Sequence, residues 1–266
     1  METTDDAVLG GRLRLLQPKR GHRVGHDAIL LAAATGGTAG EHAVDFGAGI
    51  GGAGLALAAR VPGLRVTLIE IDPALCDLAN ENARRNALGD RVHALACDVE
   101  SIPSLTAAGL REASANRVLM NPPFNDPKSQ QSSPDSERRR AHVAQEGLLS
   151  RWLASACWML KPGGVLTLIW RAADRDAVVA ALTPVFGAVA VMPVLPRPDA
   201  DPIRILVRAV KGEAGRLPDL LPDLLPDLLP DLPGLVLNDA GGKPSAAAEA
   251  VLREARPLAL AEMAAG

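Results

Sequence analysis

Short apolar runs alternate with amphipathic stretches through the middle of the chain, and this alternation predicts strands followed by helices. The stretch that begins at Asp72 and Pro73 is an example: Leu75, Ala79 and Ala83 recur at helical spacing, and Asp followed by Pro is a typical helix start. Apolar runs of strand length in the first half are residues 42–46, 65–70, 92–97 and 116–120. Strands alternating with helices indicate a mostly parallel sheet that helices cover on both faces.

The same pattern continues through the second half of the core. A helix is predicted over residues 145–160, a strand over 165–170 and a helix over 173–186. Two further apolar runs, 189–195 and 203–210, are separated by only seven residues, too few for a crossover helix, so we pair them antiparallel. We therefore expect an α/β fold with a seven-stranded, mostly parallel sheet whose last strand is antiparallel.

The chain before this alternation reads as a short extension of the core. A weakly alternating strand over residues 13–17 leads into a basic loop over 18–25. Asp27 then stands where a side chain can cap a helix that ends at the glycines after Ala34,.

The chain after the alternation carries a repeat. Leu-Pro-Asp-Leu occurs four times from Leu217, and a proline at every fourth position excludes a continuous helix. We interpret the repeats as an extended or turn-like surface insertion. A strand over residues 235–237 and a helix over 245–253 follow. The resulting division is an N-terminal extension that packs on the core (1–40), the core (41–211), the repeat insertion or linker (212–234) and a C-terminal tail (235–266).

Charge is unevenly distributed along the chain. The formal net charge of −3 argues against a general nucleic-acid binder,. The repeats alone hold four Asp and no basic residue, so the remainder carries +1. A local basic patch is expected near the N-terminus, from Arg12, Arg14, Lys19, Arg20 and Arg23.

The sequence argues against a membrane-spanning protein and against a cysteine metal site. No apolar run reaches membrane-spanning length,. The three cysteines, Cys76, Cys97 and Cys157, lack metal-ligand spacing,. We therefore expect a cytoplasmic protein with no membrane partner and no metal.

Glycines cluster where the strand over residues 42–46 ends. Asp45 precedes Gly47, Gly49 and Gly51, which open the next helix. Glycines let the backbone approach a ligand closely, and the N–H groups of a helix start point toward it. The loop also satisfies Gly-x-Gly-x-x-Gly through Gly52, so by itself it does not separate a nicotinamide dinucleotide from S-adenosylmethionine.

Two acids follow the next strands along the chain. Glu70 lies 21 residues past Gly49 at a strand end, where an acid accepts hydrogen bonds from both hydroxyls of a ribose. Asp98 follows the third strand and can accept a hydrogen bond from the exocyclic amine of an adenine. Asp72 lies nearby, but we assign it to helix capping because Pro73 follows it.

The turn Asn121-Pro122-Pro123-Phe124 follows the strand over residues 116–120. Its two prolines supply carbonyl acceptors and no N–H donors, and they stiffen the turn. Asn121 adds a side-chain acceptor, and Phe124 adds a flat ring. This rim suits a planar group that carries an NH2.

Together these residues carry a resemblance to a known family. Residues 45–51, Glu70, Asp98 and the turn at 121–124, in this order, resemble class I S-adenosylmethionine-dependent methyltransferases of the amino-group type, which are Rossmann-like. The segment Arg23-Val-Gly-His-Asp27-Ala-Ile-Leu-Leu narrows the resemblance to the tRNA1(Val) (adenine-N6)-methyltransferase family. The match covers roughly residues 12–211. The Leu-Pro-Asp-Leu repeats depart from the family, and Phe124 stands where many relatives carry Tyr.

The resemblance implies a role for each motif. S-adenosylmethionine is the expected cofactor, with Asp45 and the glycines at its methionine part, Glu70 at the ribose and Asp98 at the adenine. The Asn121 side chain and the Pro122 carbonyl are expected to hold the substrate amine, beside Pro123, while Phe124 stacks on an extracted base. The expected substrate is RNA, with tRNA as the implied class. Phosphate contacts are expected from Lys19, Arg20, Arg23 and Arg138 to Arg140; Arg23 is alternatively a contact for the cofactor carboxylate.

Other functions stay open on the residues alone. The same rim fits the NH2 of guanine, cytosine or a glutamine side chain, so ribosomal guanine-N2 and protein glutamine-N5 methylation are the alternatives. The glycine loop also allows a nicotinamide-dependent oxidoreductase, which leaves the Asn-Pro-Pro-Phe turn unexplained. A non-catalytic protein that recruits a partner through the repeats is the third class.

Overall fold

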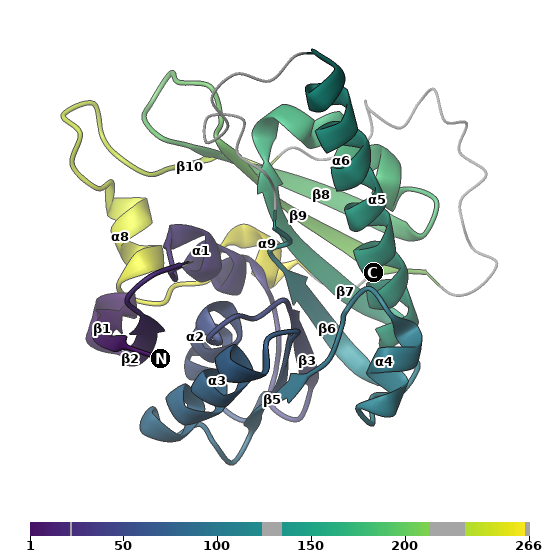
Figure 1. Ribbon diagram of the computed structural model, residues 1–266. Coiled ribbons are helices and arrows are strands. Elements are labelled where there is room, and N and C mark those ends of the chain that lie inside the picture. Colours follow the sequence, from purple (N-terminus) through teal and green to yellow (C-terminus); the bar gives the residue numbers. More distant parts are fainter. Residues whose placement is uncertain (22, 124–134, 213–231, 264–266) are drawn as a thin grey trace.

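A single mixed sheet forms the centre of the molecule (Figure 1). The computed structural model describes residues 1–21, 23–123, 135–212 and 232–263, with side chains omitted for 135–146. The strand order is β10-β8-β9-β7-β6-β3-β4-β5. The strands are β3 (His42–Phe46), β4 (Arg65–Glu70), β5 (Val92–Ala96), β6 (Ala115–Met120), β7 (Leu160–Arg171), β8 (Phe186–Leu195), β9 (Arg204–Lys211) and β10 (Leu235–Val236).

The predicted sheet is confirmed in type and direction. Neighbours from β5 to β7 are all parallel, whereas β9 runs antiparallel to both β7 and β8. The short β10 adds a further parallel strand beside β8, so the sheet has eight strands among the described residues, where seven were expected. The two strands predicted at residues 42–46 and 65–70 have the observed bounds.

Helices cover both faces of the sheet and give two separate apolar cores (Figure 1). One core joins α1 (His26–Ala34), α2 (Gly52–Arg60) and α3 (Pro73–Arg85) to the sheet. The other joins α4 (Ile102–Ala107), α5 (Asp135–Met159) and α6 (Arg175–Leu182). A 3-10 turn, η3 (Ala172–Asp174), precedes α6.

The N-terminal residues form a hairpin that packs beside the sheet. β1 (Thr3–Val8) pairs antiparallel with β2 (Leu13–Pro18) around the turn η1 (Leu9–Gly11). The sequence did not indicate β1, because its polar residues lack the alternation of a strand with one buried face. Its acids form ion pairs at the surface: Asp5 pairs with Arg14 and Arg85.

The C-terminal residues pack against the same core as α1. α8 (Ala246–Leu252) and α9 (Ala259–Glu262) both contact α1. The Leu258 N–H donates to the Ala33 carbonyl over 2.8 Å, which satisfies a carbonyl at the end of that helix.

One predicted helix cap is confirmed and one is wrong. Asp72 precedes α3 and accepts a hydrogen bond from the Ala74 N–H over 2.8 Å. Asp27 does not cap α1, whose N-cap is Gly25. Its carboxylate instead accepts a hydrogen bond from Arg204 Nε over 2.9 Å, because the start of β9 brings this cation to the helix.

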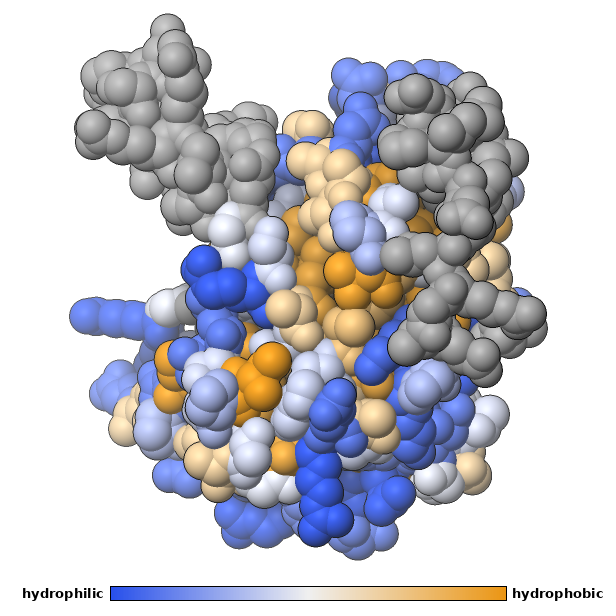
Figure 2. All heavy atoms as spheres, turned by 90° about the vertical axis from the view of Figure 1, so that its right-hand side faces the viewer, coloured by the Kyte–Doolittle hydropathy of each residue, from blue (hydrophilic) through white to orange (hydrophobic). Residues whose placement is uncertain are grey.

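One face of the molecule carries exposed hydrophobic residues (Figure 2). Figure 2 shows a central hydrophobic band on one face, with hydrophilic residues below it. Among the described residues, no helix is long and apolar enough to cross a membrane.

Candidate active site

The predicted site residues come together at one edge of the sheet, where the parallel strands end. Phe46 ends β3 and is paired with Ile69 of β4 on one side and Met120 of β6 on the other. Glu70 of β4 is paired with Ala96 of β5. The segments that follow β3, β4, β5 and β6 therefore leave the sheet side by side, as expected for a ligand site in a doubly wound sheet.

The glycine loop between β3 and α2 requires glycine for two different reasons. Gly47, Gly49 and Gly51 have φ values of 66°, 56° and 91°, a region that side chains disfavour. Gly47 also lies against Trp152, whose ring would be 2.5 Å from an added Cβ. Gly49 faces open space, with nothing within 4 Å of an added Cβ. The loop thus has a packed side and an open side.

Asp45 lies beneath this loop and is almost fully buried, with 2% of its surface exposed. Its Oδ2 accepts a hydrogen bond from the Gly54 N–H over 2.8 Å, so it fastens β3 to the first turn of α2. Burial raises the pKa of Asp45 from 3.8 to about 7, with a smaller contribution from the negative charge of Glu70, although the Gly54 hydrogen bond opposes the shift,.

Glu70 is held in place by two backbone N–H groups. Oε2 accepts from Gly49 over 2.8 Å and Oε1 accepts from Asp72 over 3.0 Å. Each carboxylate oxygen has a second acceptor position, so these contacts orient the group and leave capacity for ligand hydroxyls.

Asp98 is half-buried at the start of the segment after β5. Its Oδ1 accepts from the Glu100 N–H over 2.9 Å, a local turn contact that fixes the side chain. Trp152 Nε1 in turn donates a hydrogen bond to Glu100 Oε1 over 3.4 Å. This chain of contacts connects the Asp98 turn with the ring that packs on Gly47.

The Asn-Pro-Pro turn occupies the end of β6. Asn121 is half-buried, Pro122 is buried and Pro123 is exposed. Among the described residues, none makes a hydrogen bond with the Asn121 side chain. Phe124 lies outside the described residues.

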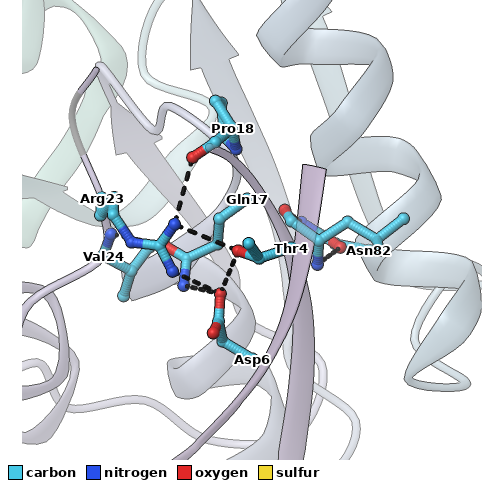
Figure 3. A network of polar contacts seen from close by, with 8 residues as sticks. Thr4, Asp6, Gln17, Pro18, Arg23, Val24 and Asn82 are labelled. Carbon is cyan, nitrogen blue, oxygen red and sulfur yellow. Dashed lines mark hydrogen bonds and ion pairs between the residues drawn. The ribbon is translucent and has the colours of Figure 1, made fainter. Parts of the chain in front are cut away.

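The predicted basic contacts have different surroundings. Arg23 donates to Asp6 Oδ2 over 2.5 Å, to Thr4 Oγ1 over 3.1 Å and to the Pro18 carbonyl over 3.2 Å (Figure 3). It therefore fastens the N-terminal hairpin. Lys19 pairs with Glu2 over 3.3 Å at the surface, and Arg20 is exposed. The side chains of Arg138, Arg139 and Arg140 lie outside the described part.

Sequence reasoning missed two residues at this edge. Ile71 follows Glu70 and is 68% exposed, which is unusual for a large apolar side chain between two acids and marks a candidate ligand contact. Trp152, on α5, contacts Phe46 edge to face with ring centroids 6.3 Å apart. An apolar residue directly after a strand-ending acid was a signal for Ile71; Trp152 gave no signal beyond helical spacing.

A recess of about 440 Å³ opens at the same edge, beyond β6. Its lining includes Ala172 after β7, Pro193 near the end of β8 and Ile205 near the start of β9. Arg175 and Asp201 supply its charged groups. The recess therefore lies on one side of Asn121 along this edge of the sheet, and the glycine loop lies on the other side.

The described residues fit S-adenosylmethionine as a cofactor. Gly49 leaves open space at the loop, Glu70 is an oriented carboxylate beside it, and Ile71 offers an exposed apolar surface. An acid suits a ribose diol and an apolar side chain suits an adenine face. No group of three or more His, Cys, Asp or Glu side chains is placed to hold a metal within the parts of the chain that the structure covers.

Curated relatives match the middle of the chain. A tRNA1(Val) (adenine(37)-N6)-methyltransferase from Porphyromonas gingivalis (strain ATCC BAA-308 / W83) is 35% identical over 153 residues, which are 55% of this chain and 58% of that protein. A release factor glutamine methyltransferase from Moorella thermoacetica is 32% identical over 130 residues, covering 47% of this chain and 44% of that protein. The matches thus span less than two thirds of these relatives.

A solved structure covers more of the fold. The crystal structure of a protein from Agrobacterium tumefaciens, described as a predicted O-methyltransferase, superposes with a TM-score of 0.68 at 27% identity. The superposition covers 87% of this chain and 97% of that one. The fold is therefore the Rossmann-like fold of class I methyltransferases, as the sequence predicted.

A family model decides the assignment. The model for the methyltransferase small domain matches residues 25–193, which include the glycine loop, Glu70, Asp98 and the Asn-Pro-Pro turn. This match supports S-adenosylmethionine as the cofactor and disfavours the nicotinamide alternative. The chain belongs to the methyltransferase small domain family.

Proposed function

We propose that this protein is an S-adenosylmethionine-dependent N-methyltransferase that acts on an exocyclic amine, adenine N6 in tRNA. The observation that carries the proposal is the pairing of Phe46 with Met120. It sets the glycine loop, the candidate cofactor site, directly beside Asn121 and Pro122, the candidate amine site. A methyl donor and its acceptor need this proximity.

The acceptor rim favours an amine over a hydroxyl. The Asn121 side-chain oxygen and the Pro122 carbonyl offer two acceptors, which match the two N–H groups of an NH2. A hydroxyl has only one hydrogen and generally needs a base to become nucleophilic. The description of the Agrobacterium protein as an O-methyltransferase is therefore not extended to this chain.

The chemistry proposed for the site is positioning and electrostatics. Bound S-adenosylmethionine supplies an electrophilic methyl group on a sulfonium. The lone pair of an aromatic amine is delocalised into its ring, so the amine is a weak nucleophile. Hydrogen bonds from the NH2 to Asn121 and Pro122 keep electron density on nitrogen and aim its lone pair. Glu70 holds the ribose, while Ile71 and Asp98 contact the adenine of the cofactor.

The choice of tRNA rests on the relatives. The Porphyromonas protein is named for adenine N6 in tRNA and has the higher identity of the two curated relatives compared above. The Moorella protein is named for glutamine in release factors, so protein glutamine-N5 methylation is the second candidate. Ribosomal guanine-N2 methylation shares the rim chemistry, with no relative above to favour it.

Two assays test the proposal in order. Calorimetric titration with S-adenosylhomocysteine and with NAD tests the cofactor, and we expect binding of the first alone. Incubation with labelled S-adenosylmethionine and unmodified bulk tRNA tests the substrate. Label recovered from the RNA as N6-methyladenosine supports the proposal. Label in N2-methylguanosine supports guanine methylation instead, and label in added release factor with none in the RNA supports glutamine methylation.

A further inference from the structure

Asn82 is a polar residue of α3 that is fully buried, with 0% of its surface exposed. Its side chain makes three hydrogen bonds. Oδ1 accepts from the Leu16 N–H over 2.8 Å, while Nδ2 donates to the Leu16 carbonyl over 3.1 Å and to the Ile50 carbonyl over 3.2 Å. The carboxamide thus pairs with strand β2 as a neighbouring strand would.

These three bonds join elements that are distant in sequence. Leu16 belongs to the N-terminal hairpin, and Ile50 lies in the glycine loop between Gly49 and Gly51. Figure 3 shows Asn82 reaching from α3 toward the hairpin. A buried carbonyl that loses its donor costs free energy, so the Asn82 amide favours one position of the loop backbone at Ile50.

A second contact connects the same hairpin with the far end of the loop. The Val24 side chain packs on Gly52, where an added Cβ would be 2.6 Å from Val24 Cγ2. The Val24 N–H donates to Gln17 Oε1 over 2.8 Å, and Gln17 Nε2 donates to Asp6 over 3.0 Å (Figure 3). The hairpin therefore supports the loop on both sides of Gly51.

We infer that Asn82 is a positioning residue of the cofactor site, which holds the glycine loop in its ligand-binding conformation by tying Ile50 to the N-terminal hairpin. The inference rests on the proposed function, since S-adenosylmethionine is taken as the ligand of that loop. Asn82 itself contacts no ligand. Its effect is on cofactor affinity, transmitted through the Ile50 carbonyl.

The chain offers a matched control one helical turn away. Asn86 Oδ1 accepts from the Arg14 N–H over 2.9 Å, and its Nδ2 donates to the Arg14 carbonyl over 2.9 Å. Asn86 thus pairs with the same strand in the same manner, near the surface. Its Nδ2 also donates to the Asn82 backbone carbonyl over 2.8 Å, but among the described residues it has no bond to the glycine loop. Asn82→Asp and Asn86→Asp remove the same NH2 group, but only the first removes a bond to Ile50.

The test is calorimetric titration of S-adenosylhomocysteine into the full chain and both variants, with amide hydrogen exchange of residues 47–54. We expect Asn82→Asp to weaken affinity by about tenfold or more, because the buried Leu16 and Ile50 carbonyls lose their donor and face an acid oxygen instead,. Exchange in the loop should become faster. Asn86→Asp is expected to change affinity by less than about twofold. Equal affinity for the Asn82 variant and the wild type overturns the inference, and so does an equal loss in both variants.

A second variant and the exchange measurement test the inference if Asn82→Asp does not fold or the wild type does not bind. If Asn82→Asp does not fold, Val24→Ala takes its place, because it trims the contact on Gly52 without removing a hydrogen bond. Weaker binding by this variant is the result expected if the N-terminal hairpin holds the glycine loop in place. Unchanged binding contradicts that role of the hairpin. Wild-type protein that binds no S-adenosylhomocysteine contradicts the proposed function, whereas the exchange of residues 47–54 still tests the role of Asn82: faster exchange in Asn82→Asp alone supports it.

Discussion

Phe46 and Met120 end two adjacent parallel strands and are paired across them. Gly47 and Asn121 are the next residues, so the loop assigned to the cofactor and the turn assigned to the amine start from neighbouring points of one rigid sheet. A site built on strand ends holds its groups more precisely than one built on long loops. This relationship makes Asn121 the residue whose removal most directly tests the chemistry.

Asn121→Ala should lower kcat by roughly 10²–10³, by analogy with the loss of one preorganised polar contact in a transition state. The affinity for S-adenosylhomocysteine should stay close to that of the wild type, because the glycine loop and Glu70 are untouched. Steady-state kinetics with tRNA and calorimetry check the two parts. Unchanged turnover would remove Asn121 from its assigned role.

Glu70 and Asp72 provide a contrast between binding and folding. Glu70→Gln removes the charge that the ribose hydroxyls would meet, and it turns an NH2 toward one of the two N–H donors, Gly49 or Asp72. It should therefore weaken S-adenosylhomocysteine binding by about tenfold or more, since hydrogen bonds to a charged group are the stronger kind. Asp72→Ala removes the cap on α3 and should cost about 1 kcal/mol of folding free energy, with affinity unchanged. Calorimetry measures the affinity of both variants, and urea unfolding measures their stability. Unchanged affinity in Glu70→Gln, or weaker binding in Asp72→Ala, would contradict these roles.

Asp45 should make folding stability depend on pH. Its pKa is raised to about 7 in the folded protein from 3.8, so the folded state binds the extra proton between these values. The free energy of unfolding contributed by this group therefore falls as pH rises from about 4 to about 7, by up to about 1.4 kcal/mol per pH unit, and is flat above that window.

Asp45→Asn tests this directly, since an amide mimics the protonated acid and keeps an oxygen for the Gly54 N–H. Urea unfolding at pH 5, 6, 7 and 8 should show the wild type losing stability relative to the variant up to about pH 7. A constant difference across this range would contradict the assigned protonation.

Gly54 tests the packing beneath the glycine loop. An added Cβ would lie 2.2 Å from Leu68 Cδ2 and 3.1 Å from Asp45 Oδ2, and Leu68 is fully buried. Gly54→Ala should therefore destabilise the fold by about 1–3 kcal/mol, as overpacking does.

Gly187 supplies the control for Gly54. Nothing lies within 4 Å of an added Cβ at Gly187, so Gly187→Ala should change stability by less than about 0.5 kcal/mol. Thermal unfolding of both variants compares them; equal midpoints would show that the first turn of α2 adapts to the methyl group.

Apolar runs and capping residues predicted two strands and one helix start correctly. The strands His42–Phe46 and Arg65–Glu70 are apolar runs bounded by turn residues, and their ends were identified correctly. The Asp72 cap was identified because Pro73 is adjacent. Strand-end positions also placed Asp45, Glu70 and Asn121 at one edge, since parallel strands end together.

Partners distant in sequence account for what was missed. Asp27 has the local features of a helix cap. Its observed partner, Arg204, lies 177 positions later in the chain, and no local pattern indicates that contact. Asn82 reads as an ordinary polar position on a helix, and its partner Leu16 is 66 positions earlier. Strand β1 has no apolar face, and its place depends on hairpin pairing and ion pairs.

Methyl transfer to adenine N6 in tRNA is the activity proposed for this protein. It is tested most directly by nucleoside mass spectrometry of unmodified bulk tRNA after incubation with the protein and S-adenosylmethionine, with Asn121→Ala as the matched control. The wild-type protein is expected to produce N6-methyladenosine, and the variant about 10²–10³-fold less. N2-methylguanosine in its place, or unmethylated RNA together with methylated glutamine in an added release factor, would contradict it.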